Sequence, residues 1–132
     1  MSLSNNQLTG IVISQIHGLT GITSLTLSNN PLGALSPLIG DLINLRTLSL
    51  GNAQISSLPD SFGNLTNLSS LVLNTNQLTG IVTSQIHTLT GLITLTLHNN
   101  PLGTISPLIG DLTQLESLSL YATQISSLPE SI

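Results

Sequence analysis

The chain has 132 residues and very little charge: one basic residue and five acidic residues give a formal net charge of −4, and 5% of the residues are charged. Globular proteins typically carry about 25% charged residues, so in this chain Ser, Thr and Asn must supply most of the polar surface that contacts solvent. A single basic residue argues against nucleic acid or an anionic membrane as a partner. Without cysteine the chain forms no disulfide and does no thiol chemistry, and its redox compartment stays open.

The apolar residues come from a narrow set, with 29 Leu and 14 Ile against one Phe and one Tyr. A core filled almost entirely by Leu and Ile is expected to repeat one packing arrangement along the chain. No apolar run reaches about 18 residues, and the opening sequence MSLSNNQ has neither a basic nor an apolar signal region. We therefore expect no membrane span and no signal peptide, although a mature fragment of a secreted protein would look the same.

In chain order, the apolar spacing divides the sequence into six coils. They are 1–18, which lacks its first part, 19–41, 42–64, 65–88, 89–111, and 112–132, which lacks its last residues. The sequence also repeats with a longer period, because residues 1–62 match residues 71–132 at 41 of 62 positions after a shift of 70. The sequence therefore predicts a single solenoid domain over residues 1–132, made of two copies of a three-coil, 70-residue unit.

The spacing inside a coil is clearest in residues 89–108, LTGLITLTLHNNPLGTISPL. Leu95 and Leu97 are two apart, which fits a short strand with one face toward a core, whereas the spacings around them fit neither a helix nor a long strand. The returning segments GALSPLIGD and GTISPLIGD are too short and too rich in Pro for a full helix. They predict turns or short 3₁₀ pieces.

The series L-x-x-L-x-L-x-x-N-x-L, repeated at 23 or 24 residues, resembles the leucine-rich repeat family over the whole chain. The segment QLTGIVTSQIHTL is also similar to the repeats of plant receptor ectodomains. The resemblance implies an α/β-type solenoid: a curved coil with a parallel β-sheet on the concave face, turns or short 3₁₀ pieces on the convex face, and nearly no α-helix. It also implies that partners bind on the concave face.

The asparagine of this motif returns in four coils, as Asn6, Asn30, Asn76 and Asn100. In the family, this side chain lies inside the turn after the strand and bonds to backbone groups of adjacent coils, as a buried amide can. Ala53 and Thr123 occupy this position in the third coil of each unit. Because Ala53 cannot make these bonds and Thr123 can make only some of them, we expect a differently shaped turn, or water, in the third coils.

Residues that flank the strand leucines are expected on the concave face. The candidate binding residues are Thr26, Ser28, Ser49, Val72, Asn74, Thr96, His98, Ser119 and Tyr121. Protein-binding surfaces are enriched in aromatic and Arg anchors, and here Tyr121, His98 and Arg46 are the residues of that kind. The alternative interpretation is a solvated sheet face of small polar residues.

The three histidines do not predict a metal site or a catalytic site. His17 and His87 stand at equivalent points of the two units, and three coils at about 4.8 Å per strand put them about 14 Å apart, too far to share an ion. His98 has no acidic residue on the adjacent strands to orient it, so a Ser-His-acid triad lacks its third member. We therefore expect no enzyme, no metal and no cofactor.

Two classes of function stay open. The first is a non-catalytic module that binds a protein or glycan ligand on its concave face, as part of a larger protein at the cell surface or outside the cell. Glycosylation acceptors at Asn64 and Asn67 fit that location, although about three would arise by chance in this composition. The second is a self-associating or surface-coating repeat protein. Hydroxyl side chains form most of one expected row on the concave face, which contains Thr26, Ser49, Val72, Thr96 and Ser119. Such a row would suit an ordered lattice such as ice, but Val72 interrupts it and a curved face fits a flat lattice poorly.

The two ends of the coil array are relevant to self-association. Repeat arrays need polar caps, and both ends here are apolar. The expected end-to-end contacts are Met1, Leu3, Leu118, Leu120 and Ile132. Unpaired terminal strands permit head-to-tail stacking into filaments or a dimer of two equivalent ends. A head-to-tail junction lacks counterparts of Leu65 and Leu68, which leaves a gap in the stack.

Overall fold

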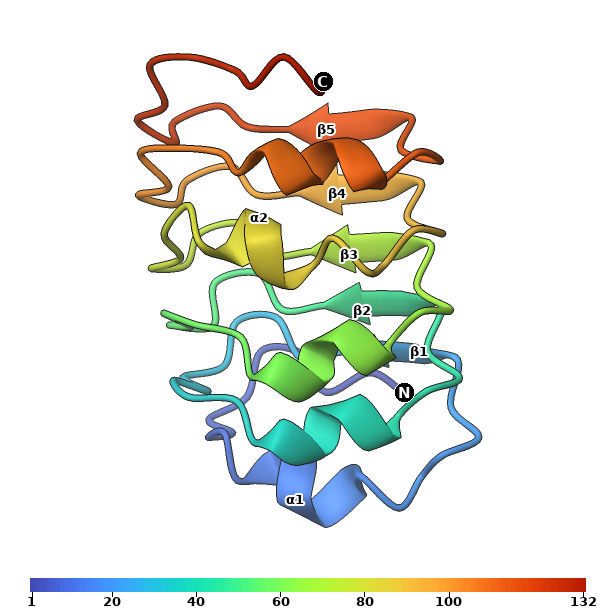
Figure 1. Ribbon diagram of the computed structural model, residues 1–132. Helices are drawn as coiled ribbons and strands as arrows, with labels where there is room; N and C mark the ends of the chain where they lie inside the picture. Colours follow the sequence, from blue (N-terminus) through green and yellow to red (C-terminus); the bar gives the residue numbers. More distant parts are fainter.

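The computed structural model describes residues 1–132, which wind into a stack of coils (Figure 1). One parallel five-stranded sheet, with its strands in sequence order, forms one side of the stack. The strands are β1 (Ser24–Thr26), β2 (Thr47–Ser49), β3 (Ser70–Val72), β4 (Thr94–Thr96) and β5 (Ser117–Ser119). The predicted solenoid with a parallel sheet is confirmed.

Short helical segments form the other side. The α-helices are α1 (Val12–Ile16) and α2 (Val82–Gln85), and the 3₁₀ helices are η1 (Pro37–Asp41), η2 (Asp60–Asn64) and η3 (Pro107–Asp111). In Figure 1 these segments are spread more widely than the strands, so the sheet lies on the concave side. No helix is long and apolar enough to cross a membrane.

Local sequence explains the two kinds of helical segment. In η1 and η3 a proline opens the segment, where a missing N–H is tolerated. The preceding serine hydroxyl accepts a hydrogen bond from the backbone N–H of the second residue of the segment, Leu38 or Leu108, at 3.3 Å in both cases. The segments GIVISQIH and GIVTSQIH contain no proline, and there the chain makes the single turns of α1 and α2. The predicted 3₁₀ pieces are therefore confirmed in the proline-containing segments.

A single cluster of 31 buried apolar residues runs through the stack. The central leucine of each strand from β1 to β4 is fully buried, as are Ile39, Phe62 and Ile86 on the returning side. Leu118, the corresponding residue of β5, is only partly buried because β5 is the last strand of the sheet. Each coil therefore buries its core against its neighbours, as expected for a repeat protein.

Buried asparagines tie neighbouring coils together, and Asn76 makes the most bonds. Its side-chain oxygen accepts the backbone N–H groups of Ala53 and Ile55 in the preceding coil, both at 3.0 Å. Its nitrogen donates to the carbonyls of Leu50 and Leu73, both at 2.9 Å. The same nitrogen is 3.2 Å from the carbonyl of Asn74, so one amide side chain bonds to five backbone groups from two coils.

The other asparagines of the column differ in how deeply they are buried. Asn30 and Asn100 are buried, and each accepts one backbone N–H of the preceding coil at 3.0 Å. Asn6 is exposed and bonds only to carbonyls of its own turn. The contribution of these asparagines to stability should therefore be smallest for Asn6.

In every coil, the residue directly before the asparagine column has a left-handed backbone conformation, with a positive φ. These residues are Asn5, Asn29, Asn52, Thr75, Asn99 and Ala122. In the third coil of each unit a second left-handed residue follows the column, Gln54 with φ 59° and Gln124 with φ 61°. The turn thus has a different shape where the asparagine is missing, as expected from the sequence.

Replacing Asn76 by Ala should lower the free energy of unfolding by about 3 kcal/mol or more, because each buried backbone group left without a partner costs about 1–3 kcal/mol. Asn6→Ala is the matched control and should cost less than about 1 kcal/mol, because its groups face water. Urea unfolding followed by circular dichroism measures both changes. Equal losses in the two variants would contradict this role of the buried column.

Candidate binding face

Two rows of side chains cross the solvent face of the sheet, which we call the concave face. The parallel register aligns the first row as Thr26, Ser49, Val72, Thr96 and Ser119. It aligns the second row as Ser24, Thr47, Ser70, Thr94 and Ser117. Every residue except Val72 carries a hydroxyl group, and none is charged. The concave face is therefore an even, neutral and polar surface.

A third row follows the carboxyl ends of the strands, because backbone hydrogen bonds continue the ladder past them. This row contains Ser28, Gly51, Asn74, His98 and Tyr121. The hydroxyl groups of Ser28 and Ser49 are 2.7 Å apart. The nine candidate residues named from the sequence all lie in the first and third rows.

Gly51 shows how tightly the third row is packed. A Cβ atom at this residue would lie 2.5 Å from the side-chain oxygen of Asn74. The backbone N–H of Gly51 donates to the hydroxyl of Ser28 at 3.1 Å. The absence of a side chain here lets Asn74 lie against the backbone of the neighbouring coil.

The third row ends in a pair of stacked rings. The rings of His98 and Tyr121 have centroids 4.1 Å apart and planes inclined by 13°. The His98 ring also bonds through Nδ1 to the hydroxyl of Ser119, at 3.2 Å. Tyr121 is 63% exposed, whereas Phe62, the other aromatic residue of the chain, is fully buried. The stack is therefore the place where an aromatic surface on the concave face meets solvent.

The charged residues of this side lie apart from the stack. Arg46 directly precedes β2 and Glu116 directly precedes β5, at equivalent places in the two units, and both are exposed. His98 and Tyr121 follow the opposite ends of their strands. The structure therefore does not bring Arg46, the third anchor considered from the sequence, to the aromatic pair.

Two contacts on the convex side were not expected from the sequence. His17 bonds to Asp41 and His87 bonds to Asp111, in both cases from Nδ1 to Oδ2 at 3.1 Å. The signal was present, since an Asp follows each His by 24 residues, which is one coil. All four side chains are partly exposed, and exposed ion pairs contribute little to stability. No group of three or more metal-ligating side chains forms around them.

The residues considered for end contacts lie at the two edges of the sheet. Ser2 makes an isolated parallel bridge to Thr26, so the start of the chain lies beside β1. Met1 and Ile132 are 44% and 56% exposed. Leu3, Leu118 and Leu120 are partly buried against the core.

The sequence and the coils together define the family. The family described as leucine-rich repeats (two copies) matches residues 43–85 and 90–131. The chain belongs to the leucine-rich repeat family. A comparison with curated proteins gives no match.

Solved structures share this fold. The chain is similar to an internalin (inlF) of Listeria monocytogenes, with 32% identity and a TM-score of 0.85 over 96% of this chain and 36% of that one. A leucine-rich repeat protein of Leptospira interrogans has 32% identity and a TM-score of 0.81 over 98% and 31% of the two chains.

The functional domain of InlJ from Listeria monocytogenes has 27% identity and a TM-score of 0.74 over 87% and 24%. That domain includes a cysteine ladder, whereas the present chain has no cysteine. This chain therefore spans only 24–36% of the length of these three proteins.

The ring stack should be measurable by a double-mutant cycle. His98→Ala and Tyr121→Ala should each change the free energy of unfolding by no more than about 1.5 kcal/mol, with a coupling energy of about 0.5–1.5 kcal/mol between them. Chemical unfolding of the two single variants and the double variant gives this coupling. The convex-side variant His87→Ala combined with Tyr121→Ala should show none. A coupling near zero for His98 and Tyr121 would mean that the rings do not stack in solution.

Proposed function

We propose that the protein is a non-catalytic binding module that recognises a protein or glycan ligand on its concave face. The observation that supports this most directly is the exposed stack of His98 and Tyr121. Aromatic residues are enriched among the anchors of binding surfaces because they bury a large area and lose little conformational entropy. On this face of small side chains, a ligand gains most of its contact area at the stack.

The surroundings of the stack favour a neutral polar ligand. Asn74, Thr96 and Ser119 offer hydroxyl and amide groups beside the rings, and the three rows contain no Lys, Arg, Asp or Glu. A strongly charged ligand would find no opposite charge there. An uncharged glycan or an uncharged peptide segment can satisfy these groups by hydrogen bonds while covering the rings.

The hydrogen bonds of the histidines support a binding role over a catalytic one. His98 bonds to Ser119 and to no carboxylate, so the pair lacks the acid that orients a catalytic histidine. The two His–Asp pairs lie on the convex side, away from the face of the rows.

We further propose that these coils belong to a larger surface or secreted protein. The similar internalin and the similar Leptospira protein are longer than this chain, which covers 36% and 31% of them. The acceptor asparagines Asn64 and Asn67 are exposed, as the attachment of a glycan requires.

Ligands for the test come from a glycan array and a library of displayed peptides. For a ligand found there, His98→Ala and Tyr121→Ala should weaken binding at least about tenfold, because the loss of a hot-spot side chain typically costs more than about 1–2 kcal/mol. Surface plasmon resonance measures the affinities. His87→Ala is the matched control on the convex side and should bind like the unchanged protein. A ligand that binds all three variants equally would rule out the concave face as its site.

Self-association is the second candidate function, and the exposed apolar ends favour it. Leu128 and Ile132 are 58% and 56% exposed near one end, and Met1 is 44% exposed at the other. β5 also presents an unpaired edge, which can template pairing with another chain.

Light scattering after size exclusion tests this candidate. If the ends hold copies together, the double substitution Leu118→Lys, Leu120→Lys should reduce the particle mass to that of one chain. Lysines at a strand edge oppose pairing by their charge and hydration. Ile43→Lys, which changes an exposed apolar residue of a middle coil, should leave the mass unchanged. A single-chain mass for the unchanged protein at every concentration would exclude self-association.

A further inference from the structure

A row of surface residues crosses the edge of the sheet at which the strands begin, on the right of the arrows in Figure 1. Thr23, Arg46, Ser69, Ile93 and Glu116 each directly precede a strand, from β1 to β5. From Arg46 onward, the backbone N–H of each residue donates to the carbonyl of the residue one coil earlier, at 2.8 or 2.9 Å. Neighbouring members are therefore one strand spacing apart, about 4.8 Å. We call this row the entry row.

The entry row carries one charge of each sign, and neither charge has a charged partner inside the chain. Arg46 is the single Lys or Arg of the protein. Glu116 lies three strand spacings from it, about 14 Å, and an exposed charge at that distance is largely screened at physiological salt. Both ion pairs of the structure join a histidine to an aspartate on the convex side. Arg46 and Glu116 are therefore available to charges of another molecule.

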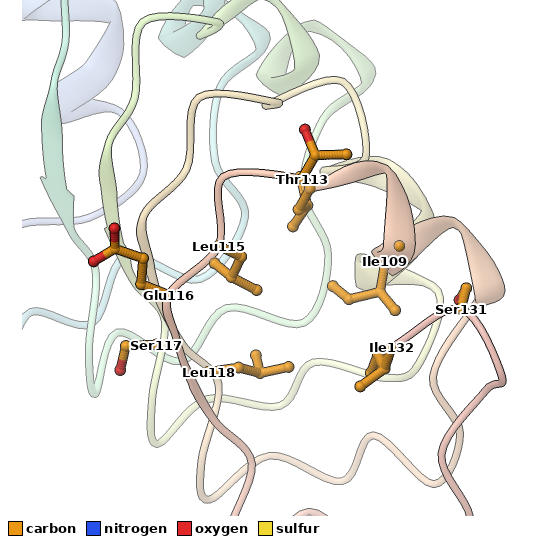
Figure 2. A pocket seen from close by; sticks show the side chains of 10 residues that line it. Ile109, Thr113, Leu115, Glu116, Ser117, Leu118, Ser131 and Ile132 are labelled. Carbon is orange, nitrogen blue, oxygen red and sulfur yellow. The ribbon is translucent and has the colours of Figure 1, made fainter.

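Glu116 is the one acidic residue that shares this edge with Arg46. Three of the other acidic residues lie in η1, η2 and η3, and Glu130 is the counterpart of Asp60 after a shift of 70. Arg46 and Glu116 are both exposed. Figure 2 shows the side chain of Leu115 among apolar side chains of the last coils, whereas the carboxylate of Glu116 points away from them. The carboxylate therefore faces outward from the edge and not into the stack.

The order of the side chains makes the entry row complementary to its own reverse. From β2 to β5 the row reads Arg46, Ser69, Ile93, Glu116. A two-fold axis through its middle, between Ser69 and Ile93, would set Arg46 of each copy opposite Glu116 of the other. The same axis would bring the two Ile93 side chains, each 42% exposed, within about one strand spacing of each other. A second copy of the chain thus matches both charges and the apolar centre of the row at once.

We propose that the entry row is the interface of a two-fold dimer, in which two chains lie side by side with their stacks antiparallel. Two ion pairs between Arg46 and Glu116 form at the ends of the interface, and Ile93 contacts Ile93 at its centre. Because both copies use the same surface, the contact closes after two chains and does not extend into a filament. The axis runs from the concave to the convex side, so the two sheets face the same way and join into one wider concave face.

This interface is small, and its charges determine which copy and which orientation fit. Exposed ion pairs contribute little to affinity and are screened by salt, so we expect a weak, reversible dimer that added salt weakens further. Contacts between the apolar ends of the stack would not be weakened by such screening. Like charges that face each other across a contact oppose it strongly, so reversing a charge is a sharper test than removing it.

Sedimentation equilibrium of the 132-residue chain, up to millimolar concentration, measures the dimer. The mass of the unchanged protein should rise toward that of two chains and no further. Arg46→Glu and Glu116→Arg should each weaken the dimer at least about tenfold, because each variant places two pairs of like charges in the interface. Asp60→Arg is the matched control: it changes the net charge as Glu116→Arg does, but in η2, and should dimerise like the unchanged protein.

Restoring the opposite charges identifies the contact. In a mixture of Arg46→Glu and Glu116→Arg, one copy supplies two negative side chains and the other supplies two positive ones, so both ion pairs form again. We expect this mixture, and the double variant Arg46→Glu, Glu116→Arg, to dimerise about as well as the unchanged protein. Ile93→Asn should weaken the dimer, whereas Ile81→Asn, which changes an exposed isoleucine of the convex side, should not.

Three results would overturn the proposal. The first is a single-chain mass for the unchanged protein at every concentration. The second is a mixture of the two charge-reversed variants that stays monomeric. The third is a dimer that both charge-reversed variants keep and that Leu118→Lys, Leu120→Lys abolishes, which would assign the contact to the ends of the stack. Circular dichroism checks that each variant is folded.

Discussion

The structure depends on the burial of each coil's leucines against the next coil. A strand of three residues has too little apolar surface and too few hydrogen bonds to be stable by itself, and a single coil has no core of its own. Stacking solves both problems at once, because the neighbour covers the leucines and completes the backbone ladder. The deep burial of Leu48 and Leu71 in the middle and the partial burial of Leu118 at the edge follow from this dependence.

The stacking of coils also explains how the chain can fold with so few charged residues. Interior positions are fixed by packing, so only the residues between them can vary, and on the concave face these are small hydroxyl residues. Backbone groups inside the turns are satisfied by asparagines such as Asn76, and no buried ion pair is needed. On this face the stacked rings of His98 and Tyr121 are therefore the clearest departure from the plain repeat.

The sequence predicted the solenoid, the parallel sheet and the 3₁₀ helices because the spacing of leucines and the position of prolines act locally. It also indicated which residues share a row, since a coil of 23 or 24 residues brings them into register. It did not reveal the stacking of Tyr121 on His98 or the bond from His17 to Asp41. These contacts depend on how side chains of adjacent coils turn toward each other, which the apolar period does not determine.

The left-handed residue before the asparagine column differs between the two units. In the first unit it is asparagine in all three coils, which tolerates this conformation well, whereas in the second unit Thr75 and Ala122 occupy it. A β-branched side chain at φ 55° is strained, so the copy that contains Thr75 gives up part of its folding energy in its turns. The two units therefore form turns of one shape at unequal conformational cost, because Thr75 and Ala122 both lie in the second unit.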